Sequence, residues 1–159
     1  MMYLQGTKEV PGLKFSLVID GEKPEEVVAT VHRRSELTDQ IEELVLSYAG
    51  EDQLPGYTED DMRMLKFAEI ECILVEDGKT YAVDGAGEMF RLKQRLYELE
   101  EMLPECFIRI NKSALANEKH LMRFSASFSG AVDAVFRCGR REYVSRRCFA
   151  QIKRRLEER

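Results

Sequence analysis

The sequence predicts a mostly β fold with short helices (α+β), in which small antiparallel sheets follow a small ββα N-terminal unit. Short β-rich runs alternate with tight-turn dipeptides through most of the chain, and apolar residues recur at helical spacing in only three stretches. The 159 residues suit one medium domain, or a small domain beside a modest one. Hydrophobic residues make up 44% and charged residues 33%, an ordinary composition for a folded domain.

The first sixty residues predict the ββα unit. The run Leu13–Ile19 alternates and is β-rich, and Val27–Val31 is a second short candidate strand. Apolar residues then recur at helical spacing between positions 37 and 48, with Ser35 or Thr38 as a candidate N-cap. A unit of this size is marginally stable alone, so we expect it to pack on the rest of the chain or on a second copy.

A polar run from Gly50 to Asp61 follows the unit. It contains Pro55-Gly56 and lacks periodicity, so it predicts a linker. We therefore expect two domains. Residues 1–58 form a small acidic N-terminal unit with a role in dimerisation or regulation, and residues 59–159 form the second domain.

After this run, turn signals typical of β-hairpins divide the chain. Asp77-Gly78 predicts a type I′ turn, because both central residues of that turn need a positive φ. Further turns are expected at Asp84–Gly87, Ser127–Gly130 and Cys138-Gly139. Strands or short apolar pieces are expected at Glu69–Val75, Lys79–Val83, Glu88–Arg91, Phe107–Ile110, Ser113–Ala116, His120–Phe124, Ala131–Phe136 and Glu142–Val144. Two helices are expected, one along Leu92–Leu103 that Pro104 ends, and one capped by Ser145 with a stripe of Phe149, Ile152 and Leu156.

The net charge of −5 is divided unevenly along the chain. Residues 1–61 carry five basic and fourteen acidic groups, a net charge of −9, whereas residues 106–159 carry thirteen basic and five acidic groups, a net charge of +8. A basic C-terminal part is typical of a protein that contacts a polyanion such as nucleic acid. A solvated face of Arg and Lys would give the same count, so charge alone does not decide between the two.

The four cysteines favour buried structural thiols over a metal site or a disulfide framework. Cys72, Cys106, Cys138 and Cys148 include no C-x-x-C pair, and each lies in an apolar or strand-like run. The sequence therefore predicts no metal site, no cofactor and a reducing, cytoplasmic location. No apolar stretch is long enough to cross a membrane, and the first residues do not resemble a secretion signal.

Three stretches of the second part carry a resemblance when they are taken together. They are the strand–turn–strand unit at residues 70–81, the helix and its sequel at residues 92–117, and Phe128-Ser-Gly130 with Tyr143–Arg147. In their order and spacing they resemble the LytTR family, the DNA-binding domain of bacterial regulators of the LytR and AlgR type. The resemblance runs from about Phe67 to Leu156. It implies small antiparallel sheets whose loops enter successive major grooves of DNA, without a helix-turn-helix.

Carried over by position, the resemblance places DNA contacts in three loops. The residues are Lys79 after the first hairpin turn, the segment Asn111, Lys112 and Ser113, and the helix start at Ser145, Arg146 and Arg147. Arg and Lys can read guanine, while hydroxyl and backbone N–H groups can bind phosphate. Asn111 can equally form a turn by bonding its own backbone. Arg146 and Arg147 are unfavourable at a helix N-terminus unless an anion binds there.

The sequence thus predicts a sequence-specific transcriptional regulator that binds repeated half-sites on double-stranded DNA as a homodimer. The N-terminal part lacks the length and acidic cluster of a phospho-receiver domain, and it resembles the small unit of stand-alone LytTR proteins, some of which pair with an inhibitory membrane protein. An enzyme is not predicted, because no nucleophile–base pairing is visible and Gly85-Ala-Gly87 lacks the rest of a dinucleotide motif. The alternative is a protein-interaction or ligand-sensing module whose basic face is only a solvated surface.

Overall fold

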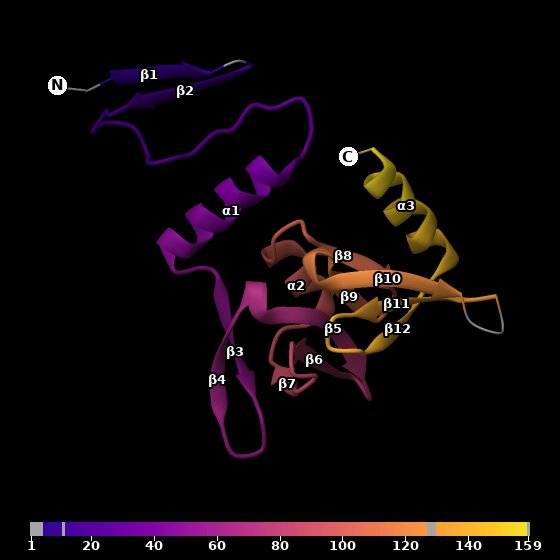
Figure 1. Ribbon diagram of the computed structural model, residues 1–159. Helices are drawn as coiled ribbons and strands as arrows, with labels where there is room; N and C mark the ends of the chain where they lie inside the picture. The colour runs from indigo at the N-terminus through magenta and orange to yellow at the C-terminus, as the bar shows by residue number, and fades with distance from the viewer. Residues whose placement is uncertain (1–4, 11, 127–129, 159) are drawn as a thin grey trace. The chain divides into compact units, whose positions relative to one another are not determined.

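The computed structural model describes residues 5–10, 12–126 and 130–158, without the side chains of residues 5 and 7–10 (Figure 1). The strands are β1 Gln5–Val10, β2 Leu13–Val18, β3 Gln53–Tyr57, β4 Met62–Lys66, β5 Ile70–Glu76, β6 Lys79–Asp84, β7 Met89–Leu92, β8 Phe107–Asn111, β9 Ala114–Asn117, β10 Leu121–Ala126, β11 Val132–Phe136 and β12 Arg141–Val144. The helices are α1 Glu36–Ala49, α2 Leu96–Met102 and α3 Arg146–Glu157, with 3-10 turns at Phe67–Glu69 and Glu118–His120. The predicted turn at Ser127–Gly130 lies largely outside the described residues. The prediction of a mostly β fold with antiparallel sheets is confirmed.

The contacts divide the chain into two compact units, Met1–Thr30 and Val31–Arg159. In the first unit, β1 and β2 pair as an antiparallel hairpin. The predicted strand at Leu13–Ile19 is therefore confirmed, but its partner is β1 and not Val27–Val31, which forms no strand. Val27 and Val28 are 67% and 74% exposed, so their β-propensity has no sheet to pack against.

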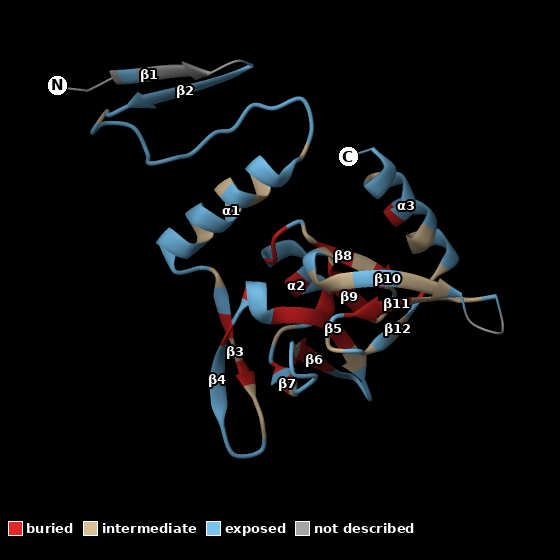
Figure 2. Ribbon diagram, in the orientation of Figure 1, coloured by how far each residue is buried: buried red, intermediate tan, exposed pale blue. Residues whose placement is uncertain are grey.

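Helix α1 begins and ends as predicted. The Ser35 N–H donates to the Thr38 Oγ1 at 2.9 Å, and Gly50 ends the helix in the left-handed conformation with φ 72°. The helix has no buried residue, and Figure 2 shows it in pale blue and tan, without red. Ion pairs connect the helix and the segment before it to the rest of the second unit: Glu43 of the helix to Lys119 at 3.2 Å, and Arg34 before the helix to Glu105 at 3.0 Å.

A seven-stranded antiparallel sheet with the order β4-β3-β7-β6-β5-β9-β8 forms the centre of the second unit. The predicted linker is wrong, because residues 53–57 form β3 and pair with β4. Leu54 and Gly56 occupy the buried face of β3. A Cβ atom at Gly56 would lie 2.6 Å from Leu65 Cδ1 and 2.8 Å from Phe90 Cβ, so only glycine lets these side chains approach.

Both faces of this sheet are covered, which explains the continuous burial of β5. One face packs with α2 around Leu54, Phe90 and Leu99. The other packs with α3 and a second sheet of order β10-β11-β12, around Leu74, Phe136 and similar residues. Alternate residues of a strand point to opposite faces, and successive β5 residues accordingly join different core clusters. The leucines of the predicted helix Leu92–Leu103 are buried in the core, although Leu92 belongs to β7 and α2 is shorter than expected.

Two buried polar side chains join the parts of this core. Glu71, 2% exposed, accepts from the Cys138 N–H at 2.8 Å and lies 3.1 Å from His120 Nδ1, which connects β5 to the three-stranded sheet. Asn117, 1% exposed, donates to the Ile70 carbonyl at 2.9 Å and accepts from the Lys119 N–H at 3.1 Å. Buried polar groups need such partners, so these bonds fix how the strands meet.

Candidate nucleic-acid interface

The three predicted loops are linked by backbone hydrogen bonds along one edge of the second unit. The Val75 N–H donates to the Ser113 carbonyl at 2.9 Å, which places the loop after β8 beside the hairpin that carries Lys79. The Ser145 N–H donates to the Ile110 carbonyl at 2.9 Å, which places the start of α3 on the other side of the same loop. The loop of Asn111–Ser113 therefore lies between the other two segments.

Five of the seven predicted residues line one depression of about 780 Å³. They are Asn111, Lys112, Ser113, Ser145 and Arg147. Lys79 and Arg146 do not line it, and both are exposed. The structure thus brings the residues of two predicted loops into one concave surface and leaves Lys79 to one side of it.

Asn111 uses both ends of its amide to hold this edge together. Its Nδ2 donates to the Tyr143 carbonyl at 2.6 Å, and its Oδ1 accepts from the Ser113 N–H at 2.7 Å. The second bond is the local turn that the sequence allows. The first joins β8 to β12, 32 residues later in the chain. With both groups engaged, the Asn111 amide holds the loop against β12.

The start of α3 carries positive charge where the helix dipole is also positive. The Ser145 Oγ caps the helix by accepting from the Cys148 N–H at 3.2 Å, and the first turn contains no acidic residue. The N–H groups of Arg146 and Arg147 precede the first intrahelical bonds and have no acceptor among the described residues. Arg146 and Arg147 are both exposed, and with these two N–H groups they place positive charge at the helix start, an arrangement that favours an anion such as phosphate.

Lys79 stands at the first position of β6, directly after the predicted turn. Asp77 and Gly78 have φ of 51° and 75°, so both central residues adopt the positive φ that a type I′ turn requires. Lys79 pairs in register with Glu76 across the hairpin and is exposed. Its ammonium group can therefore reach a ligand outside the protein without distorting the fold.

Several residues at this edge were not among the predicted contacts. Arg109 Nη1 donates to the Lys112 carbonyl at 2.9 Å and its Nη2 pairs with Glu100 at 2.5 Å, so Arg109 connects the loop to α2. Tyr143 and Gln151 also line the depression. Arg109 alternates with apolar neighbours in the sequence, a pattern that indicates a strand-covering residue and gives no signal of its contact with the loop.

Two arginines near the hairpin of β11 and β12 are already paired. Arg140 contacts Glu142 at 2.7 Å and Glu76 at 3.4 Å, and Arg141 contacts Asp133 at 3.4 Å. Burial lowers the pKa of Arg140, but the hydrogen bond and the charge of Glu142 outweigh burial, so its pKa lies above the usual value. These two side chains are less available to DNA than Arg147, which makes no ion pair among the described residues.

The four cysteines are free thiols. Cys72 is fully buried as predicted, but Cys106, Cys138 and Cys148 are only partly buried, because they lie at the ends of elements. Burial raises the pKa of the Cys72 thiol, and it raises the pKa of the Cys106 thiol to about 11. Within the described residues, no helix is long and apolar enough to span a membrane.

Comparisons with known proteins find relatives of this chain and a solved domain of similar fold. Uncharacterized HTH-type transcriptional regulators of Staphylococcus aureus strains MSSA476 and NCTC 8325 are each 26% identical to this chain over 147 residues, which cover 91% of this chain and 98% of theirs. A solved LytTr DNA-binding domain, from a Bacillus cereus protein described as a methyl-accepting/DNA response regulator, matches with a TM-score of 0.60 and 23% identity. It covers 66% of this chain and 96% of its own.

The name of the relatives mentions a helix-turn-helix, but the described helices do not form one. Strands β8 to β12 separate α2 from α3, and no short turn joins two consecutive helices. Residues 60–157 match the family model of the LytTr DNA-binding domain, which is more than half of the chain, and the solved domain shares the fold. The chain therefore belongs to the LytTr DNA-binding domain family.

Proposed function

We propose that this protein is a transcriptional regulator that binds double-stranded DNA sequence-specifically. Its three loops would enter successive major grooves, and two copies would bind repeated half-sites. The observation that carries the proposal is the edge at which Asn111–Ser113 lies bonded between the Lys79 hairpin and the start of α3. The regulators of Staphylococcus aureus, which match over almost their whole length, support a role in transcription.

The residues of this edge divide into those that read or bind DNA and those that hold the loops. Arg147 and Arg146 are exposed and can contact guanine or phosphate, as can Lys79 and Lys112. Ser145 and the first N–H groups of α3 suit a phosphate. Asn111 fixes the distance between β8 and β12, which precede two of the loops. The Ser113 carbonyl accepts a hydrogen bond from the Val75 N–H. Rigid loops of fixed spacing lower the entropy cost of docking into DNA.

We also propose the reducing cytoplasm as its compartment and a regulatory protein as a partner of the acidic N-terminal unit, residues 1–58. Four free thiols fit a reducing compartment. The division at residue 58 follows the charge of the chain, and the family match begins close by, at residue 60. The division at residue 58 lies in the turn between the paired strands β3 and β4. It therefore separates two proposed functions and not two separately packed structures.

The experiment that tests this function is selection of bound duplexes from a random DNA pool with the full chain. The expected result is enrichment of a repeated motif whose two halves are separated by about one helical turn or a multiple of it. Failure to enrich any sequence would contradict the proposal. In that case the basic face would be a solvated surface of an interaction or ligand-sensing module.

A further inference from the structure

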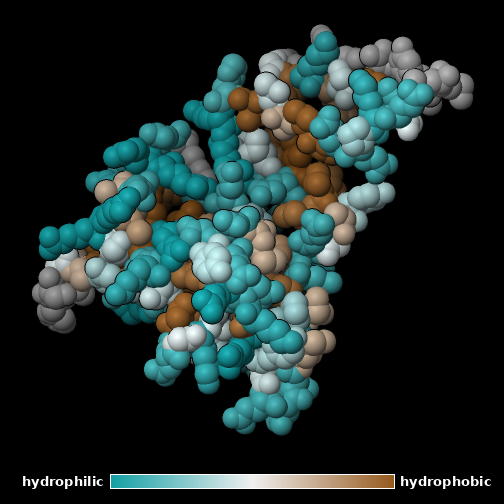
Figure 3. All heavy atoms as spheres, turned by 180° about the vertical axis from the view of Figure 1, so that it is seen from behind, coloured by the Kyte–Doolittle hydropathy of each residue, from teal (hydrophilic) through white to brown (hydrophobic). Residues whose placement is uncertain are grey.

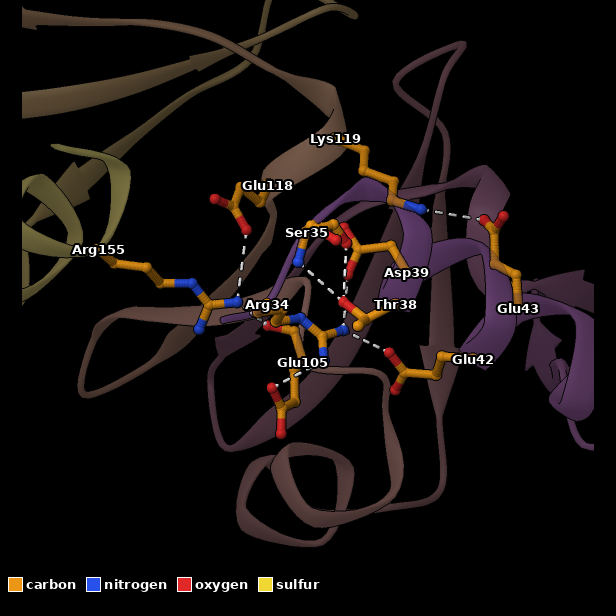
Figure 4. Close-up of polar contacts among 10 residues, drawn as sticks. All are labelled: Arg34, Ser35, Thr38, Asp39, Glu42, Glu43, Glu105, Glu118, Lys119 and Arg155. Atoms are coloured by element: carbon orange, nitrogen blue, oxygen red, sulfur yellow. Dashed lines mark hydrogen bonds and ion pairs between the residues drawn. The ribbon is translucent and has the colours of Figure 1, made fainter. Parts of the chain in front are cut away.

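Helix α1 is amphipathic, but its polar side faces its own domain. Asp39, Glu42 and Glu43 line a cavity of about 300 Å³ between the helix and the rest of the second unit, together with Lys66 and Lys119. Figure 4 shows these carboxylates directed at basic side chains of the domain and of the segment before the helix. Arg34 contacts Asp39 at 2.8 Å and Glu42 at 2.5 Å. The polar face of α1 is therefore occupied.

The apolar side of α1 is uncovered. Leu37, Leu44, Val45 and Tyr48 are 39%, 71%, 40% and 91% exposed, and Ile41 is partly exposed. Figure 3 shows brown side chains gathered over this helix. Monomeric proteins rarely expose a continuous apolar surface without a partner for it. The stripe therefore needs an occupant.

The spacing of the stripe fits a second helix of the same kind. Its members at positions 37, 41, 44 and 48 follow one another by four, three and four residues, the a/d repeat with which helices pair. The positions that flank this seam are Thr38, Gln40, Val45 and Ser47, none of which is charged. All the acidic residues of the helix lie away from the seam. An identical helix can therefore approach without repulsion, and a partner selected by charge would find no charge to recognise.

We infer that the α1 stripe, Leu37, Ile41, Leu44 and Tyr48, is an interface that joins two copies of this chain. The inference deepens the proposed function, since it rests on binding to repeated half-sites and names the surface that pairs the two DNA-binding domains. A symmetric dimer buries the same patch on both copies. The helix is only about 21 Å long, so the interface is small and we expect a dissociation constant in the micromolar range. Binding to two adjacent half-sites then raises the effective concentration of one copy beside the other.

The test measures the molar mass of the full chain by sedimentation equilibrium over the micromolar range. The stripe variant carries Leu44→Glu and Tyr48→Glu. The matched control carries Met62→Glu and Met64→Glu, which add the same charge at exposed positions of β4 outside the stripe. We expect dimers for the unchanged protein and the control. We expect a dimer dissociation constant at least about 100-fold higher for the stripe variant, because each change acts twice in a symmetric dimer. A monomeric unchanged protein, or a stripe variant that still dimerises, overturns the inference.

A second measurement does not depend on the folding of the stripe variant. Leu44→Cys is expected to form a disulfide between two copies under mild oxidation, while Met62→Cys is expected to cross-link no more than the unchanged protein. Equal cross-linking of both variants overturns the inference.

Gel shifts on a single half-site separate the two proposals. A stripe variant that binds one half-site normally but loses its preference for the repeated site supports the interface. An unchanged protein that dimerises but binds no DNA refutes the proposed function and supports the interface alone.

Discussion

Replacing Arg147 by alanine is expected to weaken binding to the selected DNA sequence without weakening the fold. Arg147 is exposed, lines the depression beside Lys112 and Ser113, and makes no ion pair among the described residues. A guanidinium that reads guanine through two hydrogen bonds contributes about 1–3 kcal/mol of discrimination. We therefore expect a loss of affinity of about 5- to 150-fold. The free energy of unfolding should change by less than about 0.5 kcal/mol, as for other exposed positions.

The assay is a fluorescence anisotropy titration of a labelled duplex, with urea unfolding measured on the same protein. Arg154→Ala is the matched control, because Arg154 is an exposed arginine of the same helix, two turns further along, without an ion pair among the described residues. It should lower affinity by less than about threefold, as one distant charge in a salt-screened solution. Equal losses for Arg147→Ala and Arg154→Ala would refute a specific role for the helix start and would indicate only a general effect of charge.

Arg147→Lys distinguishes base reading from phosphate binding. Lysine keeps the charge but loses the fork of two donors. If Arg147 reads a base, the lysine variant should bind the selected sequence nearly as weakly as the alanine variant, while its binding to unrelated DNA should be almost unchanged. Nearly full affinity in the lysine variant would show that Arg147 contacts phosphate and does not read a base.

Three further predictions concern the scaffold of this edge and the core beneath it. Asn111→Ala removes two hydrogen bonds and should lower stability by about 1–3 kcal/mol and weaken DNA binding, and unchanged urea unfolding would show that these bonds do not hold the loops. Gly56→Ala should destabilise the fold by about 1–3 kcal/mol, because the added Cβ would collide with Leu65 and Phe90. Gly85→Ala is the control and should have little effect, since a Cβ there has no neighbour nearer than 3.8 Å. Equal effects of the two changes in thermal unfolding would contradict this prediction. Because burial raises the pKa of Cys106 to about 11 from an ordinary value of 9.0, its contribution to stability is complete below pH 9.0 and is lost as the pH rises toward 11. Cys106→Ala should therefore reduce the loss of stability in that alkaline range, and an unchanged alkaline profile would argue against the shift.

The hairpin turns could be predicted from the sequence because their requirement is local. Asp77-Gly78 tolerates two successive positive φ angles, which few dipeptides do, and the structure shows both. The β-rich runs on either side of the turn then predict the paired strands β5 and β6. The caps of α1 and α3 were predicted for the same reason, since Ser35 and Ser145 act within four residues of their own position.

Strand β3 could not be predicted because its buried face contains a glycine. Leu54 and Gly56 are the inward positions, and Gly56 is there because Leu65 and Phe90 leave no room for a side chain. A sequence pattern that looks for apolar residues at alternate positions finds only Leu54 on the buried face of this strand, and Pro55-Gly56 resembles a turn. Val27–Val31 is the opposite case, since its residues favour a strand but no neighbouring strand pairs with it.

The candidate site was only partly accessible to sequence reasoning. The three loops could be named from a resemblance, but nothing local indicates that Asn111 bonds to Tyr143 or that Arg109 supports the carbonyl of Lys112. The first of these contacts joins residues 32 positions apart, and so depends on how β8 and β12 meet. Their meeting depends in turn on the core, including the bonds of Glu71 between the two sheets.

The most direct test of the central claim is a competition titration with the full chain at physiological salt. The duplex obtained by selection is labelled, and either the same sequence or a scrambled duplex of equal length and composition competes for the protein. The proposed function predicts that the selected sequence binds at least about 10³-fold more tightly than the scrambled one, with an affinity that falls steeply as salt is added. Equal competition by the two duplexes would contradict sequence-specific recognition by the loops at Lys79, Asn111–Ser113 and Arg147.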